Sequence, residues 1–346
     1  GLIIGIRRED NNKWERRVPL TPNDLISLRE RHGLRAIVQA SPIRAYTDAE
    51  YRSAGIDIAE TINDAELVFA IKEIPTELLR PSTRYVFFSH VIKGQAGNMP
   101  MLRRLLDLNC TLIDYERIVD EHNRRLIFFG VHAGHAGMIE TLWCLQRRLE
   151  EQGTPGPFAD LRHAYQYDSL DEAQRHLREI GGQIISDGLG DGLRPLVFGI
   201  AGYGNVSRGA QEVLDCLPVT EVSPSELAEA AGRDGSESND LIKVVFKEQD
   251  MVAPLDPTRE FDLQHYYDNP AEYRGRFEDH LPYLDALVNT IYWTDRYPRL
   301  VTRDWADRHY THEASGRLQV IGDISCDIEG SIELTTQATE PDAPCY

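Results

Sequence analysis

Short apolar runs alternate with helix-like stretches over the first third of the chain. Each run is the length of a single strand, and the runs cover residues 2–6, 36–39, 67–71, 85–89 and 111–115. Residues 22–32 lie between the first two runs and are predicted to form a helix, with Thr21 as N-cap and Pro22 at the first helical position. This alternation of strand and helix signals predicts an α/β fold with a parallel sheet.

The rest of the chain continues the alternation with longer helices. Residues 137–152 are predicted to form a helix that stops at Gly153, because glycine and the TPGP beyond it end helices. A charged helix is predicted over 171–180. An apolar strand over 196–201 then leads through a glycine turn into a helix over 209–217.

The sharpest local motif is this glycine turn, which reads LVFGIAGYGNVSRGA over residues 196–210 and follows a G-x-G-x-x-S pattern with Gly202, Gly204 and Ser207. Such glycines let the backbone approach a pyrophosphate, which the N-terminus of the following helix holds through its N–H groups. Glu221 ends the next predicted strand, 17 residues past Gly204, where a carboxylate could accept the adenosine ribose hydroxyls. Ser207 in the third glycine position leaves a plain strand–helix turn as the alternative.

A second strand–loop signal is RLQVIGDISCDIEGSIE at residues 317–333, in which an apolar strand leads into Asp323 and Asp327. Ligands of doubly wound sheets bind at the carboxyl ends of the strands, so these carboxylates are candidates for a site. The alternative is that both aspartates only cap the next turn.

Two titratable residues follow apolar runs in the first third of the chain. Lys72 ends LVFAIK and His90 ends YVFFSH, 18 positions later, with Pro75 and Pro81 excluding a long helix between them. We therefore expect two adjacent parallel strands that bring both side chains to one sheet edge. A lysine there can donate to a carbonyl or carboxylate, and a histidine can exchange a proton at neutral pH. Arg17, in the loop after the first strand, has the forked geometry that matches a carboxylate. The alternative is that Lys72 and His90 are ordinary solvated strand ends.

The small-residue stretch GVHAGHAGM at 130–138 contains His132 and His135. Its glycines predict close backbone packing where two domains meet. No third ligand accompanies the two histidines, so no metal site is predicted.

Composition excludes several classes of function. The chain has 37 Lys and Arg against 56 Asp and Glu, a formal charge of −19, which argues against binding to nucleic acid or anionic lipid. No apolar run approaches the roughly 20 residues that span a bilayer. The five cysteines are odd in number and scattered, which favours a reducing compartment such as the cytoplasm.

Several segments together resemble the lysine–2-oxoglutarate reductase domain of the saccharopine pathway, the lysine-forming saccharopine dehydrogenase, in the superfamily of alanine dehydrogenase and transhydrogenase. The segments are GIRREDNNKWERRVPLTP, AIKEIP, YVFFSHVIKGQAGNMP, LIDYERIVD, FGVHAGHAGMIETL, GYGNVSRGAQEVL, NTIYWTDRYPRLVTR and IGDISCDIEGSIE. A further stretch, NPAEYRGRFEDHLPYLDALVNTIYW, looks like the lysine reductase branch rather than alanine dehydrogenase.

The resemblance implies two Rossmann-like, doubly wound parallel-sheet domains with an interdomain cleft. Residues 1–135 would form the substrate domain, completed by a return segment from about residue 330 onward, and residues 136–329 would bind the dinucleotide. Family members usually continue past Tyr346, with a segment that completes the first domain and covers the cofactor.

The resemblance also implies roles for individual residues. In the substrate domain, Arg17 of the E-x-R-x-x-L-T motif would bind a substrate carboxylate and Lys72 and His90 would form the acid/base pair. Glu73 and Glu116 would line the same pocket.

In the cofactor domain, the turn would hold the pyrophosphate and the Asp323 loop would face the nicotinamide. The cofactor-binding residues implied are Gly202, Gly204, Asn205, Val206, Glu221, Asp323 and Asp327.

The activity implied is condensation of L-lysine with 2-oxoglutarate and reduction of the imine by NAD(P)H to saccharopine, or the reverse. The resemblance favours NADPH over NADH, whereas Glu221 would repel a 2′-phosphate. A homo-oligomer, a fusion to a saccharopine-oxidising domain, and a mitochondrial matrix location in a eukaryote are also compatible with the family. The alternatives are a related reductive aminase or amino-acid dehydrogenase with another substrate, and a non-catalytic nucleotide-binding module.

Overall fold

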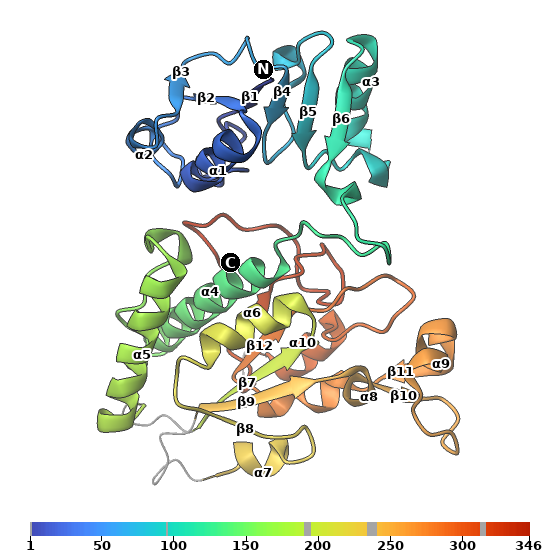
Figure 1. Cartoon of the computed structure of the whole chain (residues 1–346). Coiled ribbons are helices and arrows are strands. Elements are labelled where there is room, and N and C mark those ends of the chain that lie inside the picture. The colour runs from blue at the N-terminus through green and yellow to red at the C-terminus, as the bar shows by residue number, and fades with distance from the viewer. Residues whose placement is uncertain (1, 95, 190–194, 234–240, 312–315) are drawn as a thin grey trace. The chain divides into compact units, whose positions relative to one another are not determined.

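The chain forms two compact units, Gly1–Phe128 and Phe129–Tyr346, in a computed structural model (Figure 1). The structure describes residues 2–94, 96–189, 195–233, 241–311 and 316–346. The sequence predicted a boundary after residue 135 and a return of the last residues to the first domain. In the structure the boundary lies earlier, and residues 330–346 group with the second unit, where Ile332 bridges to Val301.

The first unit is built on a six-stranded parallel sheet. Its strands are β1 Ile3–Ile6, β2 Arg35–Gln39, β3 Asp57–Ala59, β4 Leu67–Phe69, β5 Arg84–Phe87 and β6 Thr111–Asp114. They lie in the order β3-β2-β1-β4-β5-β6, and every neighbouring pair is parallel. This is the usual order of a Rossmann nucleotide-binding sheet, and it confirms the predicted class.

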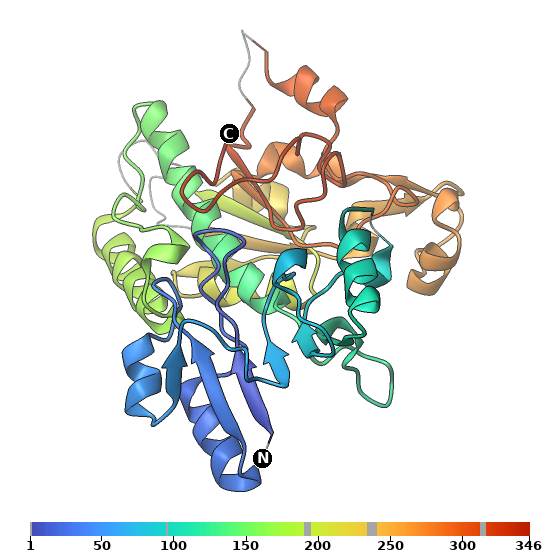
Figure 2. The same cartoon turned by 90° about the horizontal axis from the view of Figure 1, so that it is seen from above.

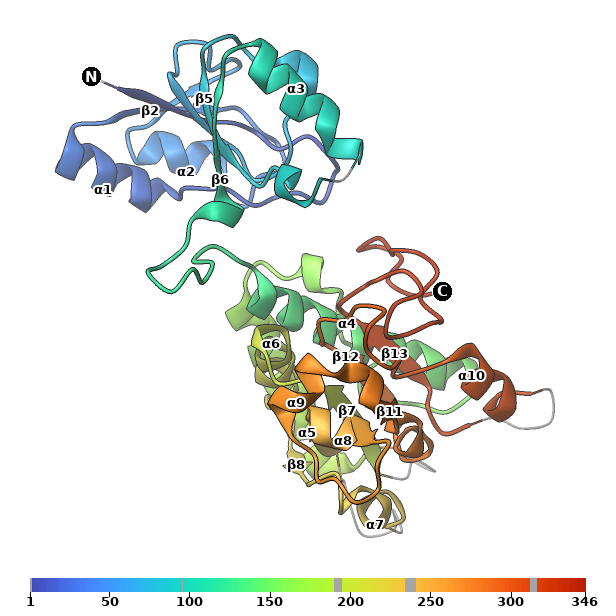
Figure 3. The same ribbon diagram turned by 90° about the vertical axis from the view of Figure 1, so that its right-hand side faces the viewer.

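Helices cover both faces of this sheet, as Figure 3 shows for α1 and α2 on one face and α3 on the other. The helices are α1 Pro22–His32, α2 Asp48–Ser53 and α3 Met99–Asp107, with short 3₁₀ turns η1 Thr76–Leu78, η2 Val91–Lys93, η3 Ala96–Asn98 and η4 Tyr115–Arg117. Successive strand residues point to opposite faces, so Ile4 packs in the cluster under α1 while Ile3 packs in the cluster with α3.

The predicted start of α1 is confirmed in detail. Thr21 is the N-cap and accepts a hydrogen bond from the Asp24 backbone N–H, while the Asp24 carboxylate accepts from the Thr21 N–H. Gly33 ends the helix with φ 64°, a left-handed conformation that favours glycine.

The second unit is built on a five-stranded parallel sheet and a separate two-stranded antiparallel sheet. The strands of the larger sheet are β7 Leu196–Ala201, β8 Val219–Glu221, β9 Leu241–Phe246, β12 Ala286–Asn289 and β13 Val320–Asp323. The antiparallel strands, β10 Val252–Pro254 and β11 Tyr273–Gly275, project with α9 from one side of this unit (Figure 2). The sheet order is β13-β12-β7-β9-β8, so β9 lies between β7 and β8.

The second unit also contains helices, two of which, α4 and α6, pack closely against each other. They are α4 Gly130–Glu151, α5 Leu170–Asp187, α6 Asn205–Leu214, α7 Leu227–Ala231, α8 Glu248–Met251, α9 Leu263–Asp268 and α10 Arg303–His309, with 3₁₀ turns η5 Ala164–Gln166, η6 Pro270–Glu272, η7 Phe277–Asp279 and η8 Leu281–Tyr283. The small-residue stretch over 130–138 is helical, because α4 begins at Gly130 rather than at the predicted residue 137.

Glycines let the backbones of α4 and α6 touch. A Cβ on Gly134 would lie 2.0 Å from the Val206 carbonyl oxygen, and a Cβ on Gly209 would lie 1.9 Å from the Val131 carbonyl oxygen. Close backbone packing was predicted from these glycines and is confirmed, inside the second unit. Among the described residues, no helix combines the length and the apolar character that crossing a membrane requires.

Candidate functional site

The candidate substrate site lies where the strands of the first unit end. Phe69 of β4 pairs with Val86 of β5, and Val86 pairs with Ile113 of β6, so the carboxyl ends of these parallel strands reach one sheet edge. Lys72 and His90 each follow the last residue of their strand by three positions. The predicted adjacency of the two strands is confirmed, and their connection contains only the short turn η1.

His90 pairs with Glu73 and not with Lys72. Its Nδ1 lies 2.5 Å from Glu73 Oε1, and both side chains are only partly exposed, at 26% and 31%. A carboxylate that accepts the Nδ1 proton orients the ring and leaves Nε2 to exchange a proton with a ligand.

The backbone at His90 is also unusual. His90 has φ 54°, a left-handed conformation that few non-glycine residues adopt. The preceding Ser89 is fully buried, and its Oγ donates to the Asp114 carboxylate at the end of β6. The ends of β5 and β6 are therefore tied together directly beneath the histidine.

Lys72 is held through its backbone by a buried carboxylate that the sequence interpretation missed. Glu9 accepts hydrogen bonds from the N–H groups of Ile71 at 2.7 Å and Lys72 at 3.1 Å. Burial raises the pKa of Glu9 above its ordinary value, although these two backbone bonds oppose the rise. Glu9 thus fixes the chain where β4 turns into the site.

Arg17 forms a forked pair with Glu15, the second carboxylate that was missed. Arg17 Nε donates to Glu15 Oε1 at 2.7 Å and Nη2 donates to Oε2 at 2.6 Å. Burial alone would raise the pKa of Glu15, but Arg17 and the charge of Lys72 outweigh it and the pKa is lowered. The first letter of E-x-R-x-x-L-T is Glu15, so the motif itself contained the signal. Glu15 therefore occupies one edge of the Arg17 guanidinium.

Glu116 presents a buried oxygen that no described protein group satisfies. Its side chain is 6% exposed, and Oε1 lies 3.3 Å from Arg125 Nη1. Within the described part of the chain, Oε2 is buried and has no hydrogen-bond partner. Buried carboxylate oxygens are nearly always paired, so this atom fits a donor brought by a ligand.

The glycine turn of the second unit has the predicted strand–turn–helix geometry. Gly202 has φ 99° and its N–H donates to the Phe246 carbonyl at 3.0 Å. Gly204 caps α6, whose first two residues are Asn205 and Val206, so the helix begins four positions before the predicted Gly209. No described atom lies within 4 Å of a Cβ built on Gly204. That open space fits the approach of a pyrophosphate to the N-terminus of α6.

Ser207, at the third position of the glycine pattern, is not accessible to a pyrophosphate. Ser207 is fully buried, and its Oγ accepts a hydrogen bond from Gln211 Nε2 at 2.9 Å. The hydroxyl is therefore used inside the helix.

The structure does not bring Glu221 to the glycine turn. Glu221 ends β8, the next strand along the chain, but β9 separates β8 from β7 in the sheet. Its carboxylate instead pairs with Lys243 Nζ at 3.0 Å, and the same ammonium pairs with Asp215 at 2.7 Å. Burial would lower the pKa of Lys243, but the two carboxylates raise it.

Asp323 is engaged within the second unit. It ends β13, and its carboxylate accepts from Asn289 Nδ2 at 2.8 Å and from Thr335 Oγ1. Asp327 lies exposed in the following loop, where partial burial and the charge of Asp323 raise its pKa. These contacts support the alternative that Asp323 organises the loop, and the nicotinamide role stays a prediction.

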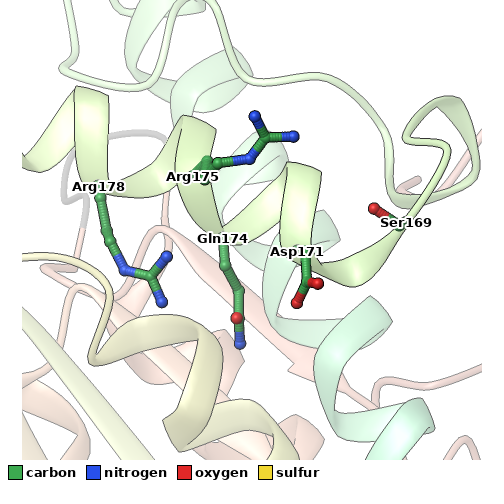
Figure 4. A pocket seen from close by; sticks show the side chains of 5 residues that line it. All are labelled: Ser169, Asp171, Gln174, Arg175 and Arg178. Carbon is green, nitrogen blue, oxygen red and sulfur yellow. The ribbon is translucent and has the colours of Figure 1, made fainter.

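We assign no function to a pocket that lies elsewhere on the second unit. It lies along α5 and is lined by Ser169, Asp171, Gln174, Arg175 and Arg178 (Figure 4). Figure 4 shows the Arg175 side chain directed away from those of Gln174 and Arg178, so the polar groups do not converge. None of the predicted site residues lines this pocket. In the described ranges, no three His, Cys, Asp or Glu side chains gather to hold a metal ion.

The two parallel sheets and the glycine turn define an α/β protein with the fold of alanine dehydrogenase. An L-alanine dehydrogenase structure matches with a TM-score of 0.55 and 18% identity, covering 92% of this chain and 76% of that one. Residues 5–136 match the family model described as alanine dehydrogenase/PNT, N-terminal domain.

The whole chain is similar to two kinds of named enzyme. It is 39% identical over 361 residues to alpha-aminoadipic semialdehyde synthase of Arabidopsis thaliana, covering 99% of this chain and 34% of that protein. The mitochondrial protein of the same name from Mus musculus is 36% identical, and the match covers 99% of this chain and 38% of that protein. A saccharopine dehydrogenase [NAD(+), L-lysine-forming] of Yarrowia lipolytica is 25% identical, and the match covers 97% of this chain and 79% of that protein. The chain thus spans about a third of the length of the synthases. These relatives confirm the resemblance found in the sequence.

Proposed function

We propose that this chain is an NAD(P)-dependent oxidoreductase of lysine metabolism. It condenses L-lysine with 2-oxoglutarate and reduces the resulting imine to saccharopine, or catalyses the reverse reaction. The observation that carries the proposal is the His90–Glu73 pair beside Lys72 at the carboxyl edge of the first sheet. The relatives, several of them named saccharopine dehydrogenase, give the substrate class.

His90 is the proton-transfer group in this mechanism. Glu73 accepts from Nδ1, so Nε2 faces the substrate and protonates the carbinolamine oxygen as water leaves. In the reverse direction the neutral Nε2 accepts the proton from the attacking water. The carboxylate of Glu73 stabilises the imidazolium while it carries the extra proton.

Lys72 acts as a charged donor to the keto-acid carbonyl. Glu9 fixes its backbone and Glu15 lies close enough to respond to its charge, so the ammonium is held near the strand edge. A hydrogen bond from this cation to the carbonyl oxygen makes the carbonyl carbon of the keto acid more electrophilic. The amine of the substrate L-lysine then attacks that carbon.

Arg17 and Glu116 provide opposite charges for the two substrates. Arg17 binds a carboxylate of the keto acid, because its forked guanidinium matches the geometry of a carboxylate. The unpaired Oε2 of Glu116 accepts from an ammonium group of lysine or saccharopine. Both roles rest on the charges and the burial of these two side chains.

The second unit supplies the cofactor site. Open space at Gly204 and the first N–H groups of α6, which include those of Asn205 and Val206, fit the pyrophosphate. Bound NAD(P)H supplies the hydride that reduces the imine. A homo-oligomer, fusion to a saccharopine-oxidising domain and the cellular compartment stay predictions.

The test is oxidation of NAD(P)H by the purified protein with L-lysine plus 2-oxoglutarate, followed by its absorbance, with saccharopine identified by mass spectrometry. Omitting either substrate should abolish turnover. Ammonia plus pyruvate is the matched control for an alanine dehydrogenase activity and should give far less turnover. Equal rates with ammonia plus pyruvate would contradict the lysine assignment. Cofactor binding without any turnover would instead support a non-catalytic module.

A further inference from the structure

A lysine follows the strand beside the glycine turn, because β9 ends at Phe246 and Lys247 is the next residue. In the usual Rossmann order, the strand next to the one that precedes the turn ends in the residue that meets the adenosine ribose. That residue is an acid in NAD-binding proteins, whereas a cation near it accommodates the 2′-phosphate of NADP. In this chain β9 occupies that place.

Hydrogen bonding fixes the end of β9 against the turn. Ala201, the last residue of β7, pairs with Phe246, the last residue of β9. The Gly202 N–H then donates to the Phe246 carbonyl at 3.0 Å. The next residue, Lys247, therefore follows the strand end that meets the ribose in the usual Rossmann arrangement.

Lys247 faces the aromatic ring of the turn itself. Its Nζ lies 6.0 Å from the centroid of the Tyr203 ring, and Tyr203 is the middle residue of G-x-G. Tyr203 is 50% exposed and Lys247 is exposed, so both can reach a ligand. No ion pair joins the Lys247 ammonium to a carboxylate of the described ranges.

The carboxylates nearest in sequence bind groups other than the Lys247 ammonium. Asp250 accepts a hydrogen bond from the Lys247 backbone N–H at 2.9 Å. Glu248 accepts a hydrogen bond from the Tyr267 hydroxyl at 2.6 Å, and the Tyr203 hydroxyl also interacts with it. Glu221 pairs with Lys243, which precedes Lys247 by four positions, roughly 13 Å along a strand. The repulsion that Glu221 would exert on a 2′-phosphate is therefore removed from the turn.

We propose that Lys247, flanked by the Tyr203 ring, binds the 2′-phosphate of NADP(H) and makes this chain select NADPH over NADH. The inference rests on the proposed function in that it requires a dinucleotide at the glycine turn. It goes further by assigning cofactor selectivity to one residue. A hydrogen bond between a lysine and a phosphate changes affinity by about 10- to 100-fold.

The experiment measures dissociation constants of NADPH and NADH by fluorescence titration or calorimetry, independently of turnover. The wild type should prefer NADPH. Lys247→Met should weaken NADPH binding by about 10- to 100-fold and leave NADH binding within about twofold, while Lys247→Arg keeps the preference. Lys247→Met should also weaken binding of adenosine 2′,5′-bisphosphate but not binding of AMP, because the two nucleotides differ by the 2′-phosphate.

Two further variants make the test selective. Arg147→Met removes another exposed cation that lies 4.9 Å from an aromatic ring, that of Trp143, and should not change the NADPH to NADH ratio. Glu221→Gln should also leave the ratio unchanged. A shift of the ratio in Glu221→Gln but not in Lys247→Met would overturn the proposal, as would a wild type that prefers NADH.

The outcomes separate this inference from the proposed function. A protein that binds NADPH through Lys247 but gives no turnover with lysine and 2-oxoglutarate contradicts the function and supports the inference. A protein that turns over these substrates while Lys247→Met keeps the NADPH affinity supports the function and overturns the inference. Absence of any dinucleotide binding by the wild type contradicts both. Circular dichroism of each variant checks that it is folded.

Discussion

The Nδ1 atom of His90 and the Oε1 atom of Glu73 lie 2.5 Å apart, although the two residues follow different strands. Residue 73 follows β4 and residue 90 follows β5, and the parallel pairing of these strands brings the two side chains together. The pair has the geometry of a histidine whose tautomer is set by a carboxylate. Its consequences can be measured directly.

His90→Gln should lower kcat by about 10²–10⁴-fold, the usual contribution of a positioned acid/base group. Glu73→Gln should lower kcat less, because the imidazole remains but its orientation and charge stabilisation are lost. Steady-state kinetics with lysine and 2-oxoglutarate provide the measurement, and cofactor affinity is the control that should not change. Wild-type turnover in His90→Gln would make this residue an ordinary strand end.

Lys72→Met should also lower kcat by about 10²-fold or more, because the carbonyl loses its charged donor. The double variant with His90→Gln should lose much less than the product of the two single losses, since groups that act as a unit are non-additive. The double-mutant cycle in kcat measures this. Losses that simply multiply would show that Lys72 and His90 act in independent steps.

Glu116→Gln should raise KM for L-lysine by about 10- to 100-fold, with a smaller effect on kcat, because the buried Oε2 loses the charge that pairs with an ammonium. The matched control is Glu66→Gln, since Glu66 is 57% exposed and its ion pair with Arg84 is long, at 3.8 Å. Unchanged KM for lysine in Glu116→Gln would mean that Oε2 does not meet the amine.

Glu15 should make the stability of the first unit depend on pH. Its pKa is lowered in the folded protein from the ordinary value of 4.5. The stabilisation is therefore complete above that value and is lost as the pH falls through the lower, folded-state pKa. Glu15→Gln should cost about 1–3 kcal/mol at neutral pH, and the difference should shrink below about pH 4. Urea unfolding at several pH values tests this, and a pH-independent difference would contradict it.

The contact between α4 and α6 should not tolerate a methyl group. Gly134→Ala and Gly209→Ala each place a Cβ within 2.0 Å of a backbone oxygen, so each should destabilise the second unit by about 1–3 kcal/mol or more. Gly182→Ala in α5 is the matched control, because no atom of the described residues lies within 4 Å of its Cβ and alanine favours helix. The melting temperature should fall in the first two variants and rise slightly in the third. Equal melting temperatures in all three would show that the helices can separate without cost.

Local signals along the chain were enough to predict the elements and several of their neighbours. Thr21, Pro22 and Gly33 carry the start and stop of α1 in their own conformational preferences, which need no distant contact. The adjacency of β4 and β5 followed from a connection too short for a helix. The glycine turn before α6 likewise depends on residues close in sequence, which is why its geometry was predicted correctly.

The partner of each side chain and the order of the second sheet were decided only by the tertiary structure. The sequence predicted that Lys72 and His90 share one sheet edge, but the contact of His90 with Glu73 became visible only in the structure. β8 follows β7 along the chain, yet β9 is the strand that pairs with β7 in the sheet. The physical reason is burial: β9 reads LIKVVF and has five of six residues buried, whereas β8 has only three residues, of which Thr220 and Glu221 are exposed. A sheet buries its apolar strand at the centre and leaves the short polar one at the edge. That choice depends on competition between distant segments, and it sets Lys247 rather than Glu221 beside the glycine turn.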